Sequence, residues 1–415
     1  MAEVLDKSKR SQRASYIMSE ASTLQKNNAL ENIAQLLGNK AESIIQENSK
    51  DLDKLTEKKG YTKAFYDRLQ LTTERIKDMA EGLRDIIALP DPIGEVTSMW
   101  RRPSGLQVGE VRVPLGVIGI IYEARPNVTI DAASLGLKSG NAVILRGSSE
   151  AINSNRALAE ILREGLREAD LPEDAVLLIE DVSRAAVTEL MQQKQYLDVL
   201  VPRGGAALIK TVVENATVPV LETGVGNCHT YVDSSADLNM ALEIADNAKT
   251  HRPGVCNAME TLLVHQDNAA SFLPQIIKRL EEKGVEIRGC QETQKHAGNI
   301  KQATEEDWKT EYLDMILAIK VVENFEEAVD HINEYGSGHS EAIVTRDYAR
   351  GHSFISRINA AAVYINASTR FTDGFEFGLG AEMGISTQKL HARGPMGLVA
   401  LTSRKYIIFG DGQIR

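Results

Sequence analysis

The chain has 415 residues, and its 58 acidic and 47 basic side chains give a formal net charge of −11. Hydrophobic residues at 43% and charged residues at 25% exclude whole-chain disorder, and the acidic balance without a long Lys/Arg block argues against a nucleic-acid partner. Three cysteines cannot form a disulfide framework, the N-terminus is charged from Glu3 onward, and no apolar run approaches the ~20 residues that span a bilayer. We therefore expect a cytoplasmic protein with no membrane contact.

Amphipathic helices are predicted at the start of the chain. Ile33, Leu36 and Leu37 recur at helical spacing, as do Ile76 and Met79 in a later segment. Between residues 90 and 114, prolines and glycines interrupt short strand-like pieces such as 107–113. This pattern of prolines and glycines between short strand-like pieces predicts a connector or a hairpin.

Two series of alternating strands and helices follow. The first is predicted to contain strands 116–123, 141–147, 175–180, 197–205 and 218–224, with helices 129–137, 150–167 and 184–193. The second is predicted to contain strands 229–233, 261–265, 285–289, 315–322, 341–345 and 361–366, with helices beginning near 238, 272 and 325. Apolar strands alternating with amphipathic helices bury both faces of a parallel sheet, so we predict two doubly wound α/β domains.

The C-terminal segment 397–413 is predicted to form a strand pair. An apolar strand at the end of a chain needs a partner edge, because unpaired backbone groups invite association. We expect this segment to pair with the early hairpin near Gln107 and with another subunit, which predicts a homo-oligomer.

The segment 250–261 places Cys256 in a loop between a helix and a strand, with Arg252 nearby. A free cysteine is more often a small buried hydrophobe than a nucleophile, but a loop position and an adjacent cation favour a reactive thiolate. Cys228 and Cys290 lie inside or beside apolar strands and are interpreted as buried. His331 and His339 belong to no zinc motif, so we expect no metal.

Several polar residues follow predicted strands. Glu222 either faces a cleft or serves as a helix cap or ion-pair partner, and Asn127 either faces a cleft or caps the helix near Thr129. The segments RGSSE (146–150) and PRGG (202–205) each offer an arginine, small residues and a helix N-terminus, a combination that suits phosphates.

Taken in order, these segments resemble the aldehyde dehydrogenase superfamily. The likeness runs through YEARPNVT (122–129), NAVILRGSSEA (141–151), LETGVGNCHTYVD (221–233), THRPGVCNAMETLLV (250–264) and INASTRFTDGFEFGLGAEMGIS (365–386), with Glu222 placed 34 positions before Cys256. The run VENFEEAVDHINEYGSGHSEAI (322–343) is similar to the signature of the branch that reduces glutamyl phosphate in proline biosynthesis.

The resemblance implies a fold of two doubly wound parallel-sheet domains plus a small β oligomerisation element. Residues 1–95 and 115–226 would form the NADPH-binding domain, 227–385 the catalytic domain, and 96–114 with 386–415 the oligomerisation element. It also implies NADPH-dependent reduction of L-glutamyl 5-phosphate to L-glutamate 5-semialdehyde and phosphate through a thioester. Functional coupling to glutamate 5-kinase follows from the same resemblance.

Individual roles are carried over from the family in the same way. Cys256 is implied as the nucleophile and Asn127 as the oxyanion-hole amide. The cofactor-binding set implied by the resemblance is Arg146, Ser148, Arg203, Gly204, Gly205, Glu222 and Glu311. The candidates for substrate binding, each with a surface or capping role as the alternative, are Arg252, Ser368, Thr369 and Arg370.

Two competing functions stay open. In a hydrolytic aldehyde dehydrogenase, Glu222 would activate water, but Thr223 stands where such enzymes have leucine, and PRGG replaces their Gly-Ser turn. A binding protein that keeps the fold without catalysis is the other alternative, and the presence of both Cys256 and Asn127 argues against it.

Overall fold

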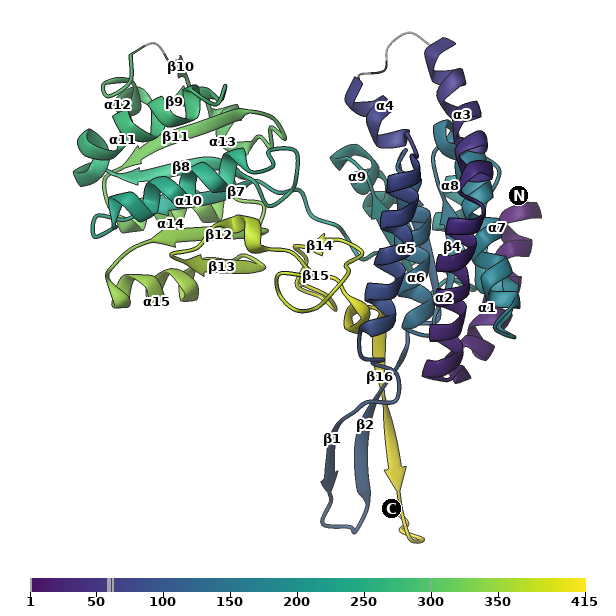
Figure 1. Ribbon diagram of the computed structural model, residues 1–415. Coiled ribbons are helices and arrows are strands. Elements are labelled where there is room, and N and C mark those ends of the chain that lie inside the picture. Colours follow the sequence, from purple (N-terminus) through teal and green to yellow (C-terminus); the bar gives the residue numbers. More distant parts are fainter. Residues whose placement is uncertain (1, 58–60, 62, 299) are drawn as a thin grey trace. The chain divides into compact units, whose positions relative to one another are not determined.

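The computed structural model describes residues 2–57, 61, 63–298 and 300–415 (Figure 1). By its internal contacts the chain divides into two compact units. Unit 1 comprises Met1–Thr223, Gly378–Gly384 and Met396–Arg415, and unit 2 comprises Gly224–Phe377 and Ile385–Pro395. Among the described residues, no helix combines the length and the apolar character that crossing a bilayer needs.

Unit 1 begins with the predicted helices. They are α1 (Ala2–Glu20), α2 (Thr23–Asn39), α3 (Ala41–Glu57), α4 (Lys63–Leu69) and α5 (Thr73–Ala88). Ser22 and Gln25 form a reciprocal capping box at the start of α2, and the Thr72 side chain accepts the N–H of Arg75 at the start of α5. The apolar stripes detected in the sequence are the buried faces of these helices.

A four-stranded parallel sheet forms the centre of unit 1. Its order is β5 (Val176–Leu178), β4 (Ala142–Arg146), β3 (Val117–Tyr122), β6 (Val199–Arg203). The helices between the strands are α6 (Asn127–Lys138), α7 (Ile152–Arg167), α8 (Arg184–Met191) and α9 (Ala206–Asn215). The chain runs from β3 out to β5 and returns to the other side of β3, so the strand order reverses between β3 and β6.

The predicted strand 218–224 is wrong. This segment makes only an isolated bridge, in which Leu200 donates to the carbonyl of Pro219 and accepts the N–H of Leu221, both at 2.8 Å. The apolar character of the segment reflects burial of Val218 and Leu221 beside the sheet rather than a ladder of its own.

A second sheet of unit 1 is antiparallel and contains β1 (Val96–Arg101), β2 (Gln107–Pro114) and β16 (Thr402–Phe409). The predicted hairpin and its pairing with the C-terminus are confirmed, because β16 matches β2 in register from Thr402 opposite Pro114 to Phe409 opposite Gln107. The predicted C-terminal strand pair is wrong, since Leu398–Leu401 forms a 3-10 turn that leads into a single strand.

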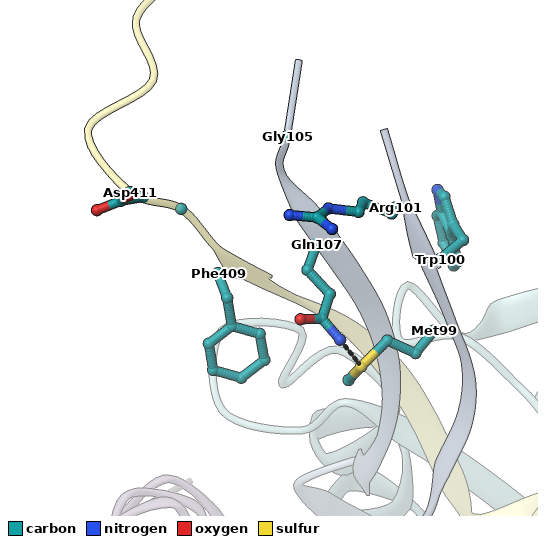
Figure 2. A pocket seen from close by; sticks show the side chains of 8 residues that line it. Met99, Trp100, Arg101, Gly105, Gln107, Phe409 and Asp411 are labelled. Atoms are coloured by element: carbon teal, nitrogen blue, oxygen red, sulfur yellow. Dashed lines mark hydrogen bonds between the residues drawn. The ribbon is translucent and has the colours of Figure 1, made fainter. Parts of the chain in front are cut away.

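The end of this three-stranded sheet carries a pocket of about 450 Å³ (Figure 2). The Gln107 side-chain amide lies 2.7 Å from the Met99 sulfur across the hairpin. The lining residues, all in unit 1, are Met99, Trp100, Arg101, Gly105, Gln107, Phe409, Gly410 and Asp411. The pocket contains none of the site residues expected from the sequence.

Unit 2 is built on a seven-stranded parallel sheet. Its order is β10 (Lys301–Gln302), β9 (Glu286–Gly289), β11 (Ile316–Val322), β8 (Met259–His265), β7 (Cys228–Val232), β12 (Ser340–Val344), β13 (Ala362–Ile365). A short pair, β14 (Ile385–Ser386) and β15 (Gly394–Pro395), lies outside this sheet.

Both faces of the unit 2 sheet are buried. Successive side chains of a strand point to opposite faces, and in β8 Leu262 packs against α10 and α11 whereas Leu263 packs against α14 and α15. The helices of this unit are α10 (Leu238–Thr250), α11 (Gln266–Glu281), α12 (Gln291–Gln294), α13 (Glu305–Lys309), α14 (Phe325–Tyr335) and α15 (Tyr348–Arg357). The predicted doubly wound α/β class is therefore confirmed.

Close packing of α7 on α2 gives a test of the unit 1 core. A Cβ at Gly165 would lie 2.4 Å from Ile33 Cγ1 and 3.0 Å from the Ile33 backbone nitrogen. We expect Gly165→Ala to cost about 1–3 kcal/mol of overpacking, more than the ~1 kcal/mol that alanine gains in a helix. Urea unfolding should show a lower midpoint.

Gly82→Ala in α5 is the matched control, because no atom lies within 4 Å of the added methyl group. It should raise the midpoint through helix propensity alone. Equal effects of the two substitutions would contradict the packing argument.

Candidate active site

Unit 1 gathers its predicted site residues at one edge of the sheet. Ligands bind open α/β sheets beyond the carboxyl ends of the strands where the strand order reverses, here between β3 and β6. Asn127 opens α6 directly after β3, and Gly204 and Gly205 follow β6. The Thr223 hydroxyl donates to the Pro202 carbonyl at 2.9 Å, which holds the neighbouring Glu222 near the end of β6.

The capping alternative for Asn127 is wrong. The helix begins at Asn127 itself, its N-cap residue is Pro126, and no side chain caps it. The Asn127 amide instead donates to the Asp131 carboxylate one turn later, at 2.9 Å. This bond fixes the rotation of an exposed amide that still has a second N–H.

Arg146, at the end of β4, is almost completely buried. Its guanidinium donates to the carbonyls of Val182, Ser183 and Gly147 at 2.6–3.1 Å. Its Nε has no hydrogen-bond partner, and burial lowers the pKa of the group. A buried arginine with an unsatisfied donor fits an anionic ligand. Ser148 follows as the residue that begins a 3-10 turn, without capping it.

The glycine pair after β6 is contacted by Glu123, a side chain that was not predicted as part of the site. Glu123 follows β3, and its carboxylate accepts the Gly205 N–H at 3.1 Å. A Cβ at Gly204 would lie 2.6 Å from the Glu123 carboxyl carbon. Arg203 ends β6 beside them. A phosphate that used this helix N-terminus would have to share it with Glu123.

Unit 2 holds Cys256 at the opposite edge of its sheet, where strands begin. The predicted loop is confirmed, since Cys256 is half-buried between α10 and β8. Its carbonyl oxygen accepts the Cys228 thiol at 3.2 Å. A Cβ at Gly226 would lie 1.6 Å from the same oxygen and 2.5 Å from the Cys256 Cα. The position of Cys256 therefore depends on the absence of a side chain at Gly226.

Arg370 interacts electrostatically with both Cys256 and Arg252. Burial and the charge of exposed Arg252 lower the pKa of Arg370, while the Cys256 thiolate opposes that change. The Arg370 Nε is buried and has no hydrogen-bond partner. Like charges are held together at a cost, so this pair is suited to an anion.

Ser368 and Thr369 connect this cluster to the cysteine loop. The Thr369 hydroxyl donates to the Asn257 carbonyl at 2.7 Å, and the Asn257 amide donates to the Thr372 carbonyl at 2.8 Å. The Ser368 side chain accepts the Arg370 N–H at 3.3 Å. Both hydroxyls thus have structural partners, and Arg370 is the member of this segment with a donor to spare.

Glu311 also reaches the cysteine loop through Gly226. Its carboxylate accepts the Gly226 N–H at 2.7 Å, and burial raises its pKa. The interpretation of Cys228 as buried is confirmed, and burial raises the pKa of its thiol. The interpretation of Cys290 as buried is wrong, because Cys290, which follows β9, is only half-buried. Within the described ranges, no group of three His, Cys, Asp or Glu residues is arranged to hold a metal.

The sequence pattern selected Cys256 and Glu311 as candidates but not the residues that contact their segments. Gly226, Asn257, Glu123 and the buried pair Lys249 and Glu260 were not predicted. A glutamate within the apolar strand METLLVH was the one signal available, since a charge amid a buried run needs a partner.

Comparison with known proteins places the chain in a family. The model described as "Aldehyde dehydrogenase family" matches residues 2–314 and 299–389. A gamma-glutamyl phosphate reductase from Clostridium perfringens is 60% identical over 413 residues, covering 100% of this chain and 99% of the relative. The protein of the same name from Carboxydothermus hydrogenoformans is 61% identical over 415 residues, covering 100% of both.

Solved structures agree. The crystal structure of gamma-glutamyl phosphate reductase from Thermotoga maritima matches with a TM-score of 0.98 and 50% identity, covering 100% of both chains. An acetylating aldehyde dehydrogenase from Geobacillus thermoglucosidasius has 18% identity and a TM-score of 0.71, which shows a shared fold.

Gly226 gives a direct test of the site geometry. We expect Gly226→Ala to displace the Cys256 backbone and to lower kcat by about a hundred-fold, the scale of a ~1 Å misplacement of a reacting group. Steady-state kinetics, with circular dichroism to verify folding, measures the effect.

Gly254→Ala in the same loop is the control. An added Cβ there meets the Leu313 carbonyl oxygen at 3.7 Å, an ordinary contact, so kcat should stay near that of the wild type. Retention of full activity by Gly226→Ala would show that the close approach does not constrain the site.

Proposed function

The chain belongs to the gamma-glutamyl phosphate reductases of the aldehyde dehydrogenase family, and from that membership we propose that it reduces L-glutamyl 5-phosphate to L-glutamate 5-semialdehyde and phosphate with NADPH. The observation that carries the proposal is the half-buried Cys256 in a loop packed against Gly226, with Arg370 in its electrostatic field and Arg252 near Arg370. This arrangement provides a nucleophile and counter-charges for a leaving phosphate.

The first step is acyl transfer. The Cys256 thiolate attacks the acyl carbon, a C–S bond forms, and the C–O bond to phosphate breaks, so a thioester and inorganic phosphate result. Arg252 and Arg370 neutralise charge that grows on the leaving phosphate, and the unpartnered Nε of Arg370 is the donor available for it. The Asn127 amide is proposed to donate to the oxyanion of the tetrahedral intermediate.

The second step reduces the thioester. When bound, NADPH supplies the hydride to the acyl carbon. The resulting thiohemiacetal on Cys256 then collapses: the C–S bond breaks, the aldehyde leaves, and Cys256 is restored as the thiolate. Arg146, with its unsatisfied Nε, is proposed to meet the cofactor's 2′-phosphate, and the Glu311 carboxylate to accept from the nicotinamide ribose. Ser148, Arg203, Gly204, Gly205 and Glu222 complete the proposed cofactor-binding set.

A hydrolytic aldehyde dehydrogenase is the competing function. It would need Glu222 to activate a water molecule that attacks the thioester. In the proposed reaction, hydride attacks the thioester in the reductive direction and phosphate attacks it in the oxidative direction, so no water is needed. The relatives' name and the cationic pair beside Cys256 favour the phosphate-dependent reaction.

We also propose that the chain forms a homo-oligomer. The exposed side chains of the β1–β2–β16 sheet, including Trp100, Tyr406 and Ile408, are proposed to meet another copy of this chain.

An acyl phosphate is a labile substrate, so functional coupling to the kinase that makes it, glutamate 5-kinase, is proposed. Three free cysteines suit a reducing compartment, and we place the protein in the cytoplasm.

The reaction is tested in the oxidative direction, with NADP⁺, glutamate semialdehyde and inorganic phosphate. We expect reduction of NADP⁺ only when phosphate is present. Cys256→Ala should lose turnover by at least ~10³-fold while NADPH binding, followed by fluorescence, stays nearly unchanged.

Cys290→Ala removes another half-buried thiol and should leave turnover intact. Phosphate-independent formation of glutamate would establish the hydrolytic alternative and reject the proposed reaction.

The arginine pair is tested by Arg370→Gln. Loss of a charge-assisted hydrogen bond to phosphate should raise the KM for phosphate by roughly 10- to 100-fold and leave the KM for NADP⁺ unchanged. Arg393→Gln is the control, because Arg393 is an exposed arginine of unit 2 that bonds Asn359. An increase confined to the KM for glutamate semialdehyde would assign Arg370 to the substrate carboxylate instead.

A further inference from the structure

Two charged side chains are completely buried beneath the cysteine loop. Lys249 Nζ lies 2.5 Å from Glu260 Oε2, and both side chains are 0% exposed. Lys249 is in the last turn of α10, and Glu260 is the second residue of β8. The loop that carries Cys256 connects these two elements, so the ion pair joins its two ends.

Such a pair has no obvious value for stability. Removing two charges from water costs several kcal/mol each, and well-packed apolar residues often replace a buried ion pair without loss. Burial raises the pKa of Glu260 and lowers that of Lys249, so the cost of desolvating the two charges exceeds the attraction between them. A role in placing other groups accounts for the pair better than stability does.

The second oxygen of Glu260 makes the further contact. Glu260 Oε1 accepts the backbone N–H of Leu313 at 3.0 Å. Leu313 has φ = 53°, a left-handed conformation that costs a leucine free energy and persists only where its surroundings impose it. The hydrogen bond from Leu313 to Glu260 is one such restraint.

These contacts close a ring around the reactive residues. Glu311, two residues before Leu313, accepts the Gly226 N–H, and Gly226 packs against the Cys256 backbone. The backbone that follows Cys256 enters β8, which contains Glu260, and this connection completes the ring. Every member of this ring lies in unit 2.

We propose that Lys249 and Glu260 are positioning residues: the Glu260 carboxylate, held by Lys249, ties the segment of Glu311 to the strand that follows Cys256. This hydrogen-bonded link keeps the Glu311 carboxylate, proposed to bind the ribose, at a fixed position relative to Cys256. This inference rests on the proposed function, in which Glu311 contacts the cofactor. Neither residue touches a reacting atom.

Two double variants isolate the tether. Lys249→Met with Glu260→Gln removes both charges and keeps a side-chain oxygen to accept from Leu313. Lys249→Met with Glu260→Met removes both charges and that oxygen. The two variants bury similar volumes, so differences between them report the tether rather than charge or packing.

The Gln variant keeps the acceptor for Leu313 but loses the lysine that holds it, so we expect its kinetics to change less than those of the Met variant. The Met variant should raise the KM for NADP⁺ roughly ten-fold, the scale of one hydrogen bond to a positioned group, and slow alkylation of Cys256 by iodoacetamide. A lower KM for NADP⁺ and faster alkylation in the Gln variant than in the Met variant would show that the side-chain oxygen positions these groups. A role in stability alone would not separate the two variants in these measurements. Glu260→Asp keeps the charge but shortens the side chain, so it should also raise the KM for NADP⁺. This single variant replaces the double variants in the test if they fail to fold.

A matched ion pair in unit 1 provides the control. Lys26 and Asp91 are buried 2.6 Å apart, and the other Asp91 oxygen accepts the Ile93 N–H at 3.0 Å. Lys26→Met with Asp91→Asn, compared with Lys26→Met with Asp91→Leu, should change the melting temperature but neither the KM for NADP⁺ nor the alkylation rate.

Equal KM and alkylation rates in the Gln and Met variants would overturn the inference. So would an equal change in the Lys26 and Asp91 variants, since the effect would then be general destabilisation. Absence of phosphate-dependent activity in the wild type would instead reject the proposed function, while the alkylation rates would still report whether Glu260 positions the cysteine loop.

Discussion

The close approach of two backbones, at Gly226 and Cys256, is the constraint on which the rest of the site depends. No side chain fits between them, because a Cβ on Gly226 would coincide with the Cys256 carbonyl. The same glycine donates its N–H to Glu311, and the Cys228 thiol occupies another side of that carbonyl. One residue without a side chain thus constrains the positions of both the Cys256 backbone and the Glu311 carboxylate.

Local charge differs in sign from the charge of the chain. A net charge of −11 repels anionic ligands in general, so a site for an anion requires cations held locally. Arg146, Arg252 and Arg370 meet this need in different ways. Arg146 and Arg370 each keep a buried donor unsatisfied, whereas Arg252 is exposed. Desolvated guanidinium groups gain more from an incoming anion than exposed ones do.

Sequence reasoning succeeded where a single segment carries its own signal. Strand and helix periodicity predicted the central strands of both parallel sheets and the helices between them. It failed where the outcome depends on distant residues: segment 218–224 has the composition of a strand but makes only one isolated bridge, to Leu200 in β6. The partners of Glu260 and Gly205 come from other elements, so no local pattern encodes them.

The two units use opposite edges of the same kind of sheet, and one cluster explains the difference. The strand order of unit 2 reverses between β7 and β12, and the carboxyl ends there would normally receive a ligand. Asp233 fills that place, fully buried and bonded to Arg350, Ser235 and Thr345 at 2.6–2.8 Å. This network occupies the carboxyl end of β7 with side chains that bond one another, whereas the candidate residues lie at the amino ends of β7 and β8. Gly226 and Cys256 precede those two strands. Placing a nucleophile there requires restraints that the sheet does not supply, and the buried Lys249 and Glu260 pair meets that requirement.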